Sequence, residues 1–228
     1  MSGREATPAG RPPAREPVLL AADDDLLVVD KPAGWLVHAA GTADPDLVSW
    51  LTLQGHGHPA PVHRIDKETS GVVILARVSG VAAELGEALA KGEVGKTYHA
   101  VVHGRARKKG TIRRPLQEGR RHVDAVTRYV TEAWLGRFSL LRVHTDTGRK
   151  HQIRRHLQGL GHPLVGDDRY GPKRFVPVPG FPWRLWLHAS EVALPDGRTY
   201  TAPLPPELET CLEALRAGSG EAPGTEEP

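Results

Sequence analysis

The feature that most restricts the fold of this chain is Val72–Ala76, a run of apolar residues that directly follows the polar segment His63–Gly71. A run this apolar and this short predicts a strand that is packed on both faces. The segment before it is then expected to be a rigidly held turn, which suits a functional site. In this turn Asp66 follows Arg64 by two residues, which indicates a carboxylate kept ionised as a nucleophile by positive charge. A surface ion pair explains the same two residues equally well when they are taken alone.

Composition limits the class of protein. A length of 228 residues suits one large domain or two small ones. The single cysteine, Cys211, excludes a disulfide framework and a multi-cysteine zinc site, and it favours a reduced, cytoplasmic location. No apolar run approaches the roughly 20 residues of a membrane helix, and the N-terminal segment lacks the apolar stretch of a secretory signal. We therefore expect a cytoplasmic monomer with no membrane partner.

Positive charge is concentrated in one part of the chain. Residues 105–155 contain 15 Lys/Arg and 4 Asp/Glu, a net charge of +11, whereas the whole chain carries +3. The other residues therefore sum to −8. This distribution indicates a face that binds a polyanion. A solvated hairpin crossed by salt bridges is the alternative interpretation.

The two ends of the chain differ from its middle. Residues 1–17 contain four prolines and no apolar periodicity, and residues 217–228 are rich in Gly, Pro and Glu, so both ends are predicted to be disordered. Residues 18–216 are predicted to form one domain. Its expected strands are Leu26–Asp30, Leu36–His38, Val72–Ala76, Thr97–His103, Thr111–Arg114, His122–Val130, Phe138–His144 and Leu187–Leu194. Its expected helices are Asp46–Leu53, Ser79–Lys91, Arg149–Leu160 and Pro205–Arg216, with Asp46 and Ser79 as N-caps.

The order of these elements predicts the fold class. Strands outnumber helices, and short turns containing Gly119 and Gly136 join several of them. This favours an α+β fold with a mixed, mainly antiparallel sheet and excludes a regular βαβ repeat.

Four segments resemble motifs of the RluA-type pseudouridine synthases, and they occur in that family's order. His63–Gly71 resembles the signature His-Arg-Leu-Asp, two variable residues, Thr-Ser-Gly, with Ile65 in place of leucine. The other three are similar to its Lys-Pro-x-Gly turn, its Lys-x-Tyr strand and its long C-terminal motif: Lys31–His38, Lys96–Gly104, and Thr147–His156 running on to Gly161–Asp167. The resemblance implies the pseudouridine synthase fold, a bent sheet with flanking helices and a central catalytic cleft.

The resemblance also implies an isomerase that detaches uracil from its ribose in RNA, turns it and rejoins it through carbon 5. This chemistry requires neither a metal nor an organic cofactor, and none is expected. Asp66 is implied as the nucleophile or key carboxylate, and Arg154 as the ion-pair partner that lowers its pKa. Tyr98 is implied as the aromatic residue that stacks on a flipped uracil and assists proton transfer. Whether Asp66 attacks the sugar or the base, and which group takes the carbon-5 proton, are left open.

RNA contacts are expected from basic residues near these motifs. Arg64 would fill the gap left by the flipped base. His63, Thr69 and Ser70 are expected to support the turn, the last two by hydrogen bonds to its backbone. Phosphate contacts are expected from the remaining candidates: Arg113, Arg114, Arg120, Arg121, Arg149, Lys150 and Arg155.

The RNA partner is predicted to be tRNA in preference to rRNA. Segments 31–38 and 147–156 look most like the branch of the family that modifies tRNA near the acceptor stem. The segment Asp168–Gly171 departs from that branch, which often has His where this chain has Tyr170.

Two alternative functions have weaker support. A catalytically inactive RNA-binding module would not need Asp66 in a basic site, and a hydrolase would need a general base beside it. Signals for other sites are incomplete. Gly92–Thr97 lacks the first glycine of a phosphate loop, and His151 and His156 lie five residues apart instead of the four of a helical zinc pair. No metal site is expected.

Overall fold

The computed structural model describes residues 15–39, 41–174 and 176–219. The predicted disordered ends, 1–17 and 217–228, therefore lie mostly outside the described residues. Residues 217–219 do belong to the described part, where they continue the last helix.

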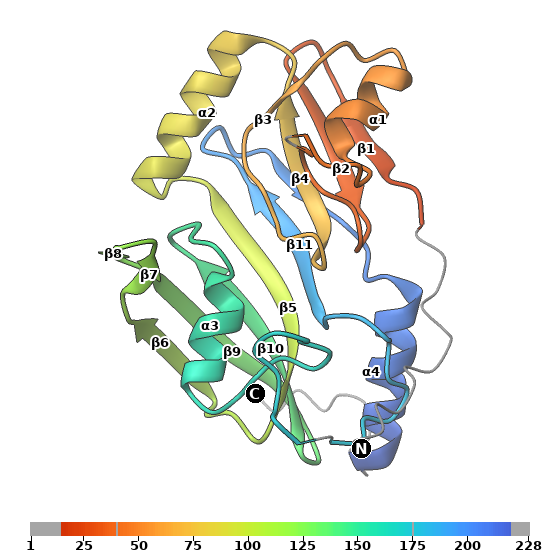
Figure 1. Cartoon of the computed structure of the whole chain (residues 1–228), viewed down its shortest axis with the longest axis vertical. Coiled ribbons are helices and arrows are strands. Elements are labelled where there is room, and N and C mark those ends of the chain that lie inside the picture. Colours follow the sequence, from red (N-terminus) through yellow and green to blue (C-terminus); the bar gives the residue numbers. More distant parts are fainter. Residues whose placement is uncertain (1–14, 40, 175, 220–228) are drawn as a thin grey trace, which may run out of the picture.

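Helices and strands follow the mixed order that the sequence predicts (Figure 1). The helices of the described residues are α1 (Leu47–Leu53), α2 (Ser79–Lys91), α3 (Gln152–Gly159) and α4 (Pro206–Ser219). The first strands are β1 (Val18–Ala22), β2 (Leu26–Lys31), β3 (Ala60–Pro61), β4 (Ser70–Ala76), β5 (Gly95–His103) and β6 (Lys109–Arg113). The later strands are β7 (Leu116–Glu118), β8 (Arg121–Val123), β9 (Val126–Leu135), β10 (Phe138–Thr145), β11 (Leu187–Ala193) and β12 (Thr199–Thr201).

One large sheet runs through the molecule in the order β1-β2-β4-β11-β5-β10-β9-β6, with β3 and β12 paired to β4 and β11. Among the strand pairs of the described residues, only β4 and β11 run parallel. The N-terminal and C-terminal halves of the sheet therefore meet at this pair. Gly71 makes the close approach possible: its φ is 118°, and a side chain there would overlap the carbonyl oxygen of Ala189.

Both faces of β4 are buried, as the sequence predicts for this strand. Val72 and Ile74 pack in one cluster with Leu85 of α2, whereas Val73 and Leu75 pack in another with residues of α1. The strand is therefore packed on both faces, and it anchors one end of the turn that precedes it.

The other half of the sheet is covered in the same way. Ile153 and Leu157 of α3 pack against β5 and β10, and Leu208 of α4 belongs to a separate cluster with the alternate residues of these strands. Tyr98 of β5 packs against both the α1 cluster and the α3 cluster. It therefore lies between the two halves, on the face that carries α1 and α3.

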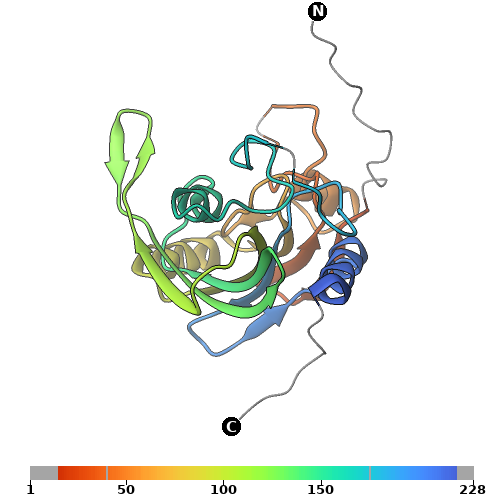
Figure 2. The ribbon, with the colours of Figure 1, turned by 90° about the horizontal axis from the view of Figure 1, so that it is seen from below.

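Strands β7 and β8 form a separate two-stranded sheet, here called the basic hairpin. Figure 2 shows this hairpin extending away from the main sheet, on the same side as α3. The +11 segment thus contributes both the end of the sheet and a projecting arm.

Two predicted strands differ from the structure. The strand expected at Leu36–His38 is absent, because the backbone of Leu36 is bonded to Pro45 and Leu47 in a loop that leads into α1. The strand expected at His122–Val130 is divided into β8 and β9, where the chain turns from the hairpin into the main sheet. The predicted cap is confirmed: the Asp46 side chain accepts a hydrogen bond from the N–H of Ser49 at 3.0 Å.

Two predicted helices have different ends. The helix expected at Arg149–Leu160 begins only at Gln152, because the Gln152 side chain holds the preceding residues in a non-helical turn. Leu160, the last residue of the expected helix, is 46% exposed. In α2 the N-cap is Val78, and Ser79 is the first helical residue.

Candidate active site

A cavity of about 510 Å³ lies where the two halves of the sheet meet. Its walls come from the turn before β4, from β5 and the end of β10, and from the segment that leads into α3. It brings together six of the site residues predicted from the sequence: Arg64, Asp66, Tyr98, Arg149, Lys150 and Arg154.

The other predicted RNA-binding residues lie away from this cavity. Arg114 and Arg155 line a second groove of about 530 Å³ between the basic hairpin and α3. Arg113, Arg120 and Arg121 line neither of these two hollows and are exposed on β6 and on the hairpin. The predicted set therefore divides into a cavity group and a hairpin group.

The segment Lys31–Gly34 is hydrogen-bonded to the turn that carries Asp66. The Lys31 side chain is fully buried, and its Nζ donates to the carbonyl oxygens of Pro32, Trp35 and Lys67 at 3.0, 2.8 and 3.3 Å. Burial lowers the pKa of Lys31 to about 7. The N–H of Gly34 also donates to Lys67, at 2.7 Å. Lys31 and Gly34 thus fix the backbone next to Asp66.

A buried polar network holds the other end of the turn. Ser70 Oγ lies 2.9 Å from His188 Nδ1 and accepts a hydrogen bond from Arg184 at 2.8 Å. His188 Nε2 lies 3.1 Å from the carbonyl of Ala202, so this nitrogen carries the proton and Nδ1 accepts from Ser70. The expected bond from Ser70 to the turn backbone is therefore wrong. The hydroxyl of Thr69, expected to do the same, is buried without a partner among the described residues.

His63 has the supporting role that the sequence predicts. Its Nε2 accepts a hydrogen bond from the N–H of Ile74 at 3.1 Å, and burial lowers its pKa to about 4. It is therefore neutral near pH 7 and braces β4.

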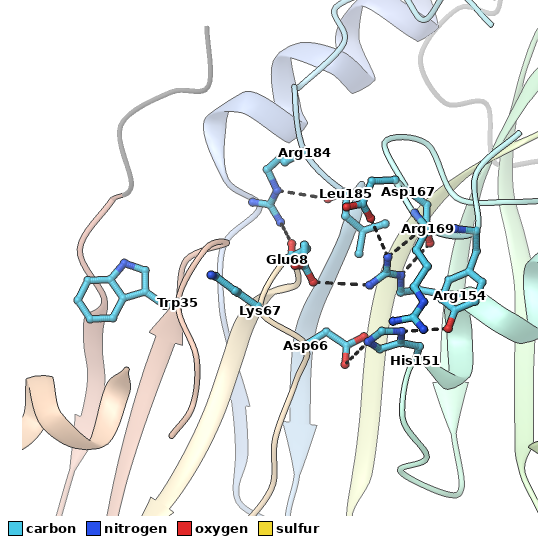
Figure 3. Close-up of polar contacts among 12 residues, drawn as sticks. Trp35, Asp66, Lys67, Glu68, His151, Arg154, Asp167, Arg169, Arg184 and Leu185 are labelled. Carbon is cyan, nitrogen blue, oxygen red and sulfur yellow. Dashed lines mark hydrogen bonds and ion pairs between the residues drawn. The ribbon is translucent and has the colours of Figure 1, made fainter. Parts of the chain in front are cut away.

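Arg154 does not form the predicted ion pair with Asp66. Its guanidinium is 2% exposed and donates from Nε and Nη2 to the two carboxylate oxygens of Asp167, each at 2.8 Å (Figure 3). Its Nη1 lies 3.6 Å from Glu68. The planar fork of arginine matches one carboxylate in a bidentate pair, and Asp167 occupies that position. The direct influence of Arg154 on Asp66 is therefore its longer-range electrostatic field.

Asp66 is an incompletely paired carboxylate. Among the described basic groups only His151 comes within 4.0 Å of it, with Nε2 3.9 Å from Oδ1 (Figure 3). Burial raises the pKa of Asp66, and this effect outweighs the opposing charges of His151, Arg154 and Arg64. Arg154 does act to lower this pKa, as expected, but the net shift is upward because burial is the larger effect.

Tyr98 lies at the cavity wall beside Asp66. Burial and then the negative charge of Asp66 raise the pKa of Tyr98 to about 12. The hydroxyl therefore stays protonated near pH 7. It can donate a hydrogen bond, and it is a poor base.

The segment before α3 is shaped by Gln152. Its Oε1 accepts hydrogen bonds from the N–H of Arg149 at 3.0 Å and from the hydroxyl of Thr147 at 2.7 Å, and its Nε2 donates to the carbonyl of Val126 at 2.9 Å. Gln152 thereby ties this segment to β9 and places Arg149, Lys150 and His151 at the cavity.

The sequence reasoning missed several residues that shape the site. Asp167 is the last residue of the C-terminal motif, so the sequence did mark its position. Its pairing with Arg154 was not expected. Arg184 and His188 lie more than 110 residues from the Ser70 hydroxyl they hold, and no local pattern marks them. For His151 the sequence offers only its distance from His156, which does not fit a helical zinc pair.

Two other kinds of feature are absent from the described part of the chain. It contains no group of three or more His, Cys, Asp or Glu side chains placed to hold a metal ion. None of its helices is both long enough and apolar enough to span a bilayer.

This chain is similar in sequence to RNA pseudouridine synthases. A model of the family described as RNA pseudouridylate synthase matches residues 25–159. "Uncharacterized RNA pseudouridine synthase YlyB" of Bacillus subtilis is 34% identical over 219 residues, which cover 85% of this chain and 71% of the relative.

Two further relatives carry more specific names. "tRNA pseudouridine synthase C" of Pectobacterium carotovorum is 35% identical and covers 75% of this chain. "Ribosomal large subunit pseudouridine synthase D" of Zymomonas mobilis is also 35% identical and covers 72%. The chain spans only 54% and 60% of the lengths of these two relatives.

The fold is also similar to that of a solved pseudouridylate synthase structure. The solved structure of "Human RNA Pseudouridylate Synthase Domain Containing 4" matches with a TM-score of 0.75 and 26% sequence identity, over 87% of this chain and 92% of that one. The fold predicted from the sequence is thus confirmed.

Proposed function

This chain belongs to the RNA pseudouridylate synthase family, a family of isomerases, and we propose that it converts one specific uridine of a structured RNA to pseudouridine, with tRNA favoured over rRNA. The observation that carries this proposal is the cavity at the junction of the two sheet halves. It brings the half-buried, poorly paired carboxylate of Asp66, the ring of Tyr98 and several cations together in a single hollow.

Asp66 is the reacting carboxylate of this proposal. It lies on a turn fixed by Lys31 and by the Ser70 network, which suits a group that must meet a substrate carbon at a set distance. Its side chain is only 23% exposed, and this partial burial raises its pKa. A partly desolvated carboxylate is more reactive toward an electron-poor centre.

Tyr98 and Arg64 handle the flipped nucleotide in this proposal. The ring of Tyr98 offers a flat surface for uracil, and its protonated hydroxyl can donate to the base or to Asp66. Arg64 is exposed at the rim, where it can enter the duplex from which the base has left.

Arg154 has a modified role. It does not pair with Asp66, but it holds the Asp66 turn through Glu68 and places a buried positive charge near the reacting carboxylate. It is therefore a positioning residue that also contributes an electrostatic field.

RNA binding is assigned to the cavity rim and the basic hairpin together. Arg149 and Lys150 lie at the cavity, and Arg114 and Arg155 both line the second groove. Arg113, Arg120 and Arg121 extend this positive surface outward along β6 and the hairpin. Charges in such a line suit the phosphates of a short helix next to the flipped base.

The preference for tRNA rests on the resemblance of segments 31–38 and 147–156 to the tRNA-modifying branch. Relatives of equal identity bear a tRNA name and a ribosomal name, so the RNA must be identified by experiment. Purified protein would be incubated with total tRNA transcripts and, separately, with large-subunit rRNA fragments, and pseudouridine would be mapped at nucleotide resolution. Asp66→Asn serves as the matched control for background modification.

The expected result is one modified uridine in a tRNA transcript, absent with the control variant. Modification of rRNA fragments alone would overturn the tRNA preference and leave the reaction class standing.

Replacing Arg120 and Arg121 by Gln should weaken binding to all RNAs, with a decrease of roughly 0.7–0.9 in the log–log salt slope for each phosphate that is no longer neutralised. A salt slope equal to that of the wild type would show that the hairpin does not face the RNA.

A further inference from the structure

His151 combines an unusual backbone with a position beside the reacting carboxylate. Its φ of 53° lies in the left-handed region, which residues other than glycine adopt rarely and at a cost in energy. It is the N-cap of α3 but makes no capping hydrogen bond with its side chain. The ring instead lines the cavity, with Nε2 3.9 Å from Asp66 and its side chain 14% exposed. Strain of this kind occurs at functional sites, because a particular side chain is held in a particular place.

Tyr170 fixes the direction of the His151 ring. Its hydroxyl lies 3.1 Å from His151 Nδ1, and the two rings meet edge to face at 5.6 Å. Tyr170 is itself held between Arg154 and Arg169, whose guanidinium carbons lie 5.3 and 5.6 Å from its ring centre. The Tyr170 hydroxyl can accept a hydrogen bond from Nδ1–H, and in that tautomer the imidazole presents an unprotonated Nε2 to the cavity and to Asp66.

We propose that His151 is the base that removes the carbon-5 proton of the rejoined uracil, and that Tyr170 holds its ring in position for that step. This inference rests on the proposed function. After carbon 5 has bonded to the ribose, that carbon still carries its hydrogen, and nitrogen 1 is joined to carbon 6 by a double bond. His151 Nε2 takes the hydrogen as a proton, and the electron pair of the broken bond forms the double bond between carbons 5 and 6. The former N1=C6 pair moves to nitrogen 1, which takes a proton from water. One proton leaves and one is added, so the reaction stays isomeric.

The other acceptors at the cavity are less suited to this step. Asp66 is assigned to the reacting sugar or base, and Glu68 is engaged with Arg154 at 3.6 Å. The phenol of Tyr98, with a pKa of about 12, has no vacant proton site near pH 7. Asp168 also lines the cavity, but its side chain is 82% exposed. Burial lowers the pKa of His151, so its imidazole is neutral and able to accept a proton.

The decisive variant is His151→Gly. Glycine adopts the left-handed conformation without strain, so the turn is preserved and a hole of imidazole size is left. Single-turnover pseudouridine formation would be measured at saturating enzyme, on RNA carrying hydrogen or deuterium at carbon 5. The rate should fall roughly 10²- to 10⁴-fold, the usual contribution of a general base. A primary deuterium isotope effect should appear, and added imidazole should restore part of the rate.

Two matched variants complete the test. His151→Asn tolerates the left-handed backbone and keeps an amide that can reach Tyr170, but it has no basic nitrogen. It should be as slow as His151→Gly and insensitive to imidazole. Tyr170→Phe should slow the reaction only roughly two- to tenfold, the effect of one hydrogen bond. Asp66→Asn should show no response to imidazole.

The results separate this proposal from the proposed function. A wild-type protein that makes no pseudouridine on any RNA would remove the proposed function itself. An active wild type together with an equally fast His151→Gly would overturn only the role of His151. A slow His151→Gly with neither an isotope effect nor rescue by imidazole would also overturn it, because His151 would then be structural.

Discussion

Two aspartates near one arginine have opposite surroundings. The Asp167 side chain is fully buried and accepts two hydrogen bonds from Arg154 as well as those from the N–H groups of Arg169 and Tyr170. Burial alone would raise its pKa, but these bonds outweigh that effect and hold the pKa below its ordinary value. Asp167 is therefore a satisfied anion, and it fixes Arg154 in place.

Asp66 is more exposed, at 23% for the side chain, yet it is less well satisfied. Its closest basic group is His151 at 3.9 Å, beyond hydrogen-bonding distance, and burial raises its pKa. The difference shows how the site divides its charges. The guanidinium is bound to Asp167, so Asp66, the proposed reactive carboxylate, is left with unused capacity to interact with substrate.

The largest expected effect is on the rate of the Asp66→Asn variant. The substitution is nearly isosteric but removes charge and nucleophilicity, so we expect pseudouridine formation to fall by about 10³-fold or more. RNA binding should remain close to wild type, and the melting temperature should be equal or higher, because a desolvated charge is removed. Rate, RNA affinity and thermal melting on the same preparation check this. A marked fall in the melting temperature would mean that Asp66 is satisfied in the way Asp167 is.

Arg154→Ala should produce the largest loss of stability. Removing one partner of a buried pair leaves Asp167 uncompensated and costs about 3–5 kcal/mol of unfolding free energy. Turnover should also fall, because the Asp66 turn is no longer held through Glu68. Urea unfolding of a double-mutant cycle with Asp167→Asn should give a coupling energy on the order of 1–3 kcal/mol. The corresponding cycle of Arg154→Ala with Asp66→Asn should give a coupling energy below about 0.5 kcal/mol. Equal coupling energies in the two cycles would contradict the conclusion that Arg154 pairs with Asp167 and not with Asp66.

Tyr98→Phe should affect turnover, which depends on Asp66, and should leave the Asp167–Arg154 pair unchanged. The ring and its packing remain, so RNA affinity should change little, while loss of one hydrogen bond to a charged or reacting group should slow turnover about ten- to hundredfold. Stability and the pH range set by Asp167 should be unchanged. An unaltered rate would show that Tyr98 only stacks on the base.

The sequence predicted the parts of this site that depend on local pattern. The strand at Val72–Ala76 and the turn with Asp66 before it are marked by a short apolar run after polar residues, and both are as predicted. A common site for Asp66, Tyr98 and Arg154 was implied by the resemblance to the family, and the three residues do line one cavity. Catalytic roles for these residues are still predictions.

The remainder depended on contacts that the sequence does not encode locally. The choice of Arg154 between two aspartates is decided by which carboxylate meets its fork in the folded chain. The sign of the Asp66 pKa change depends on burial, which outweighs the neighbouring cations counted in the sequence. The left-handed backbone of His151 lies in the turn that the Gln152 side chain closes, and a helical pattern gave no sign of it.

The smallest expected effect, and the most direct comparison of the two aspartates, is the pH dependence of stability. The folded-state pKa of Asp167 is lower than its unfolded value of about 3.9. Its ionised form therefore stabilises the fold above about pH 4, and this contribution is lost as the pH falls through the folded-state pKa. The folded-state pKa of Asp66 is raised, so its ionisation destabilises the fold as the pH rises from about 3.9. Unfolding free energies from urea titrations between about pH 3 and pH 7 should then diverge from wild type in opposite directions. As the pH rises, Asp167→Asn should become less stable than wild type and Asp66→Asn more stable. Two difference curves with the same sign of slope would show that both carboxylates are satisfied alike, and the distinction between a structural and a reactive aspartate would fail.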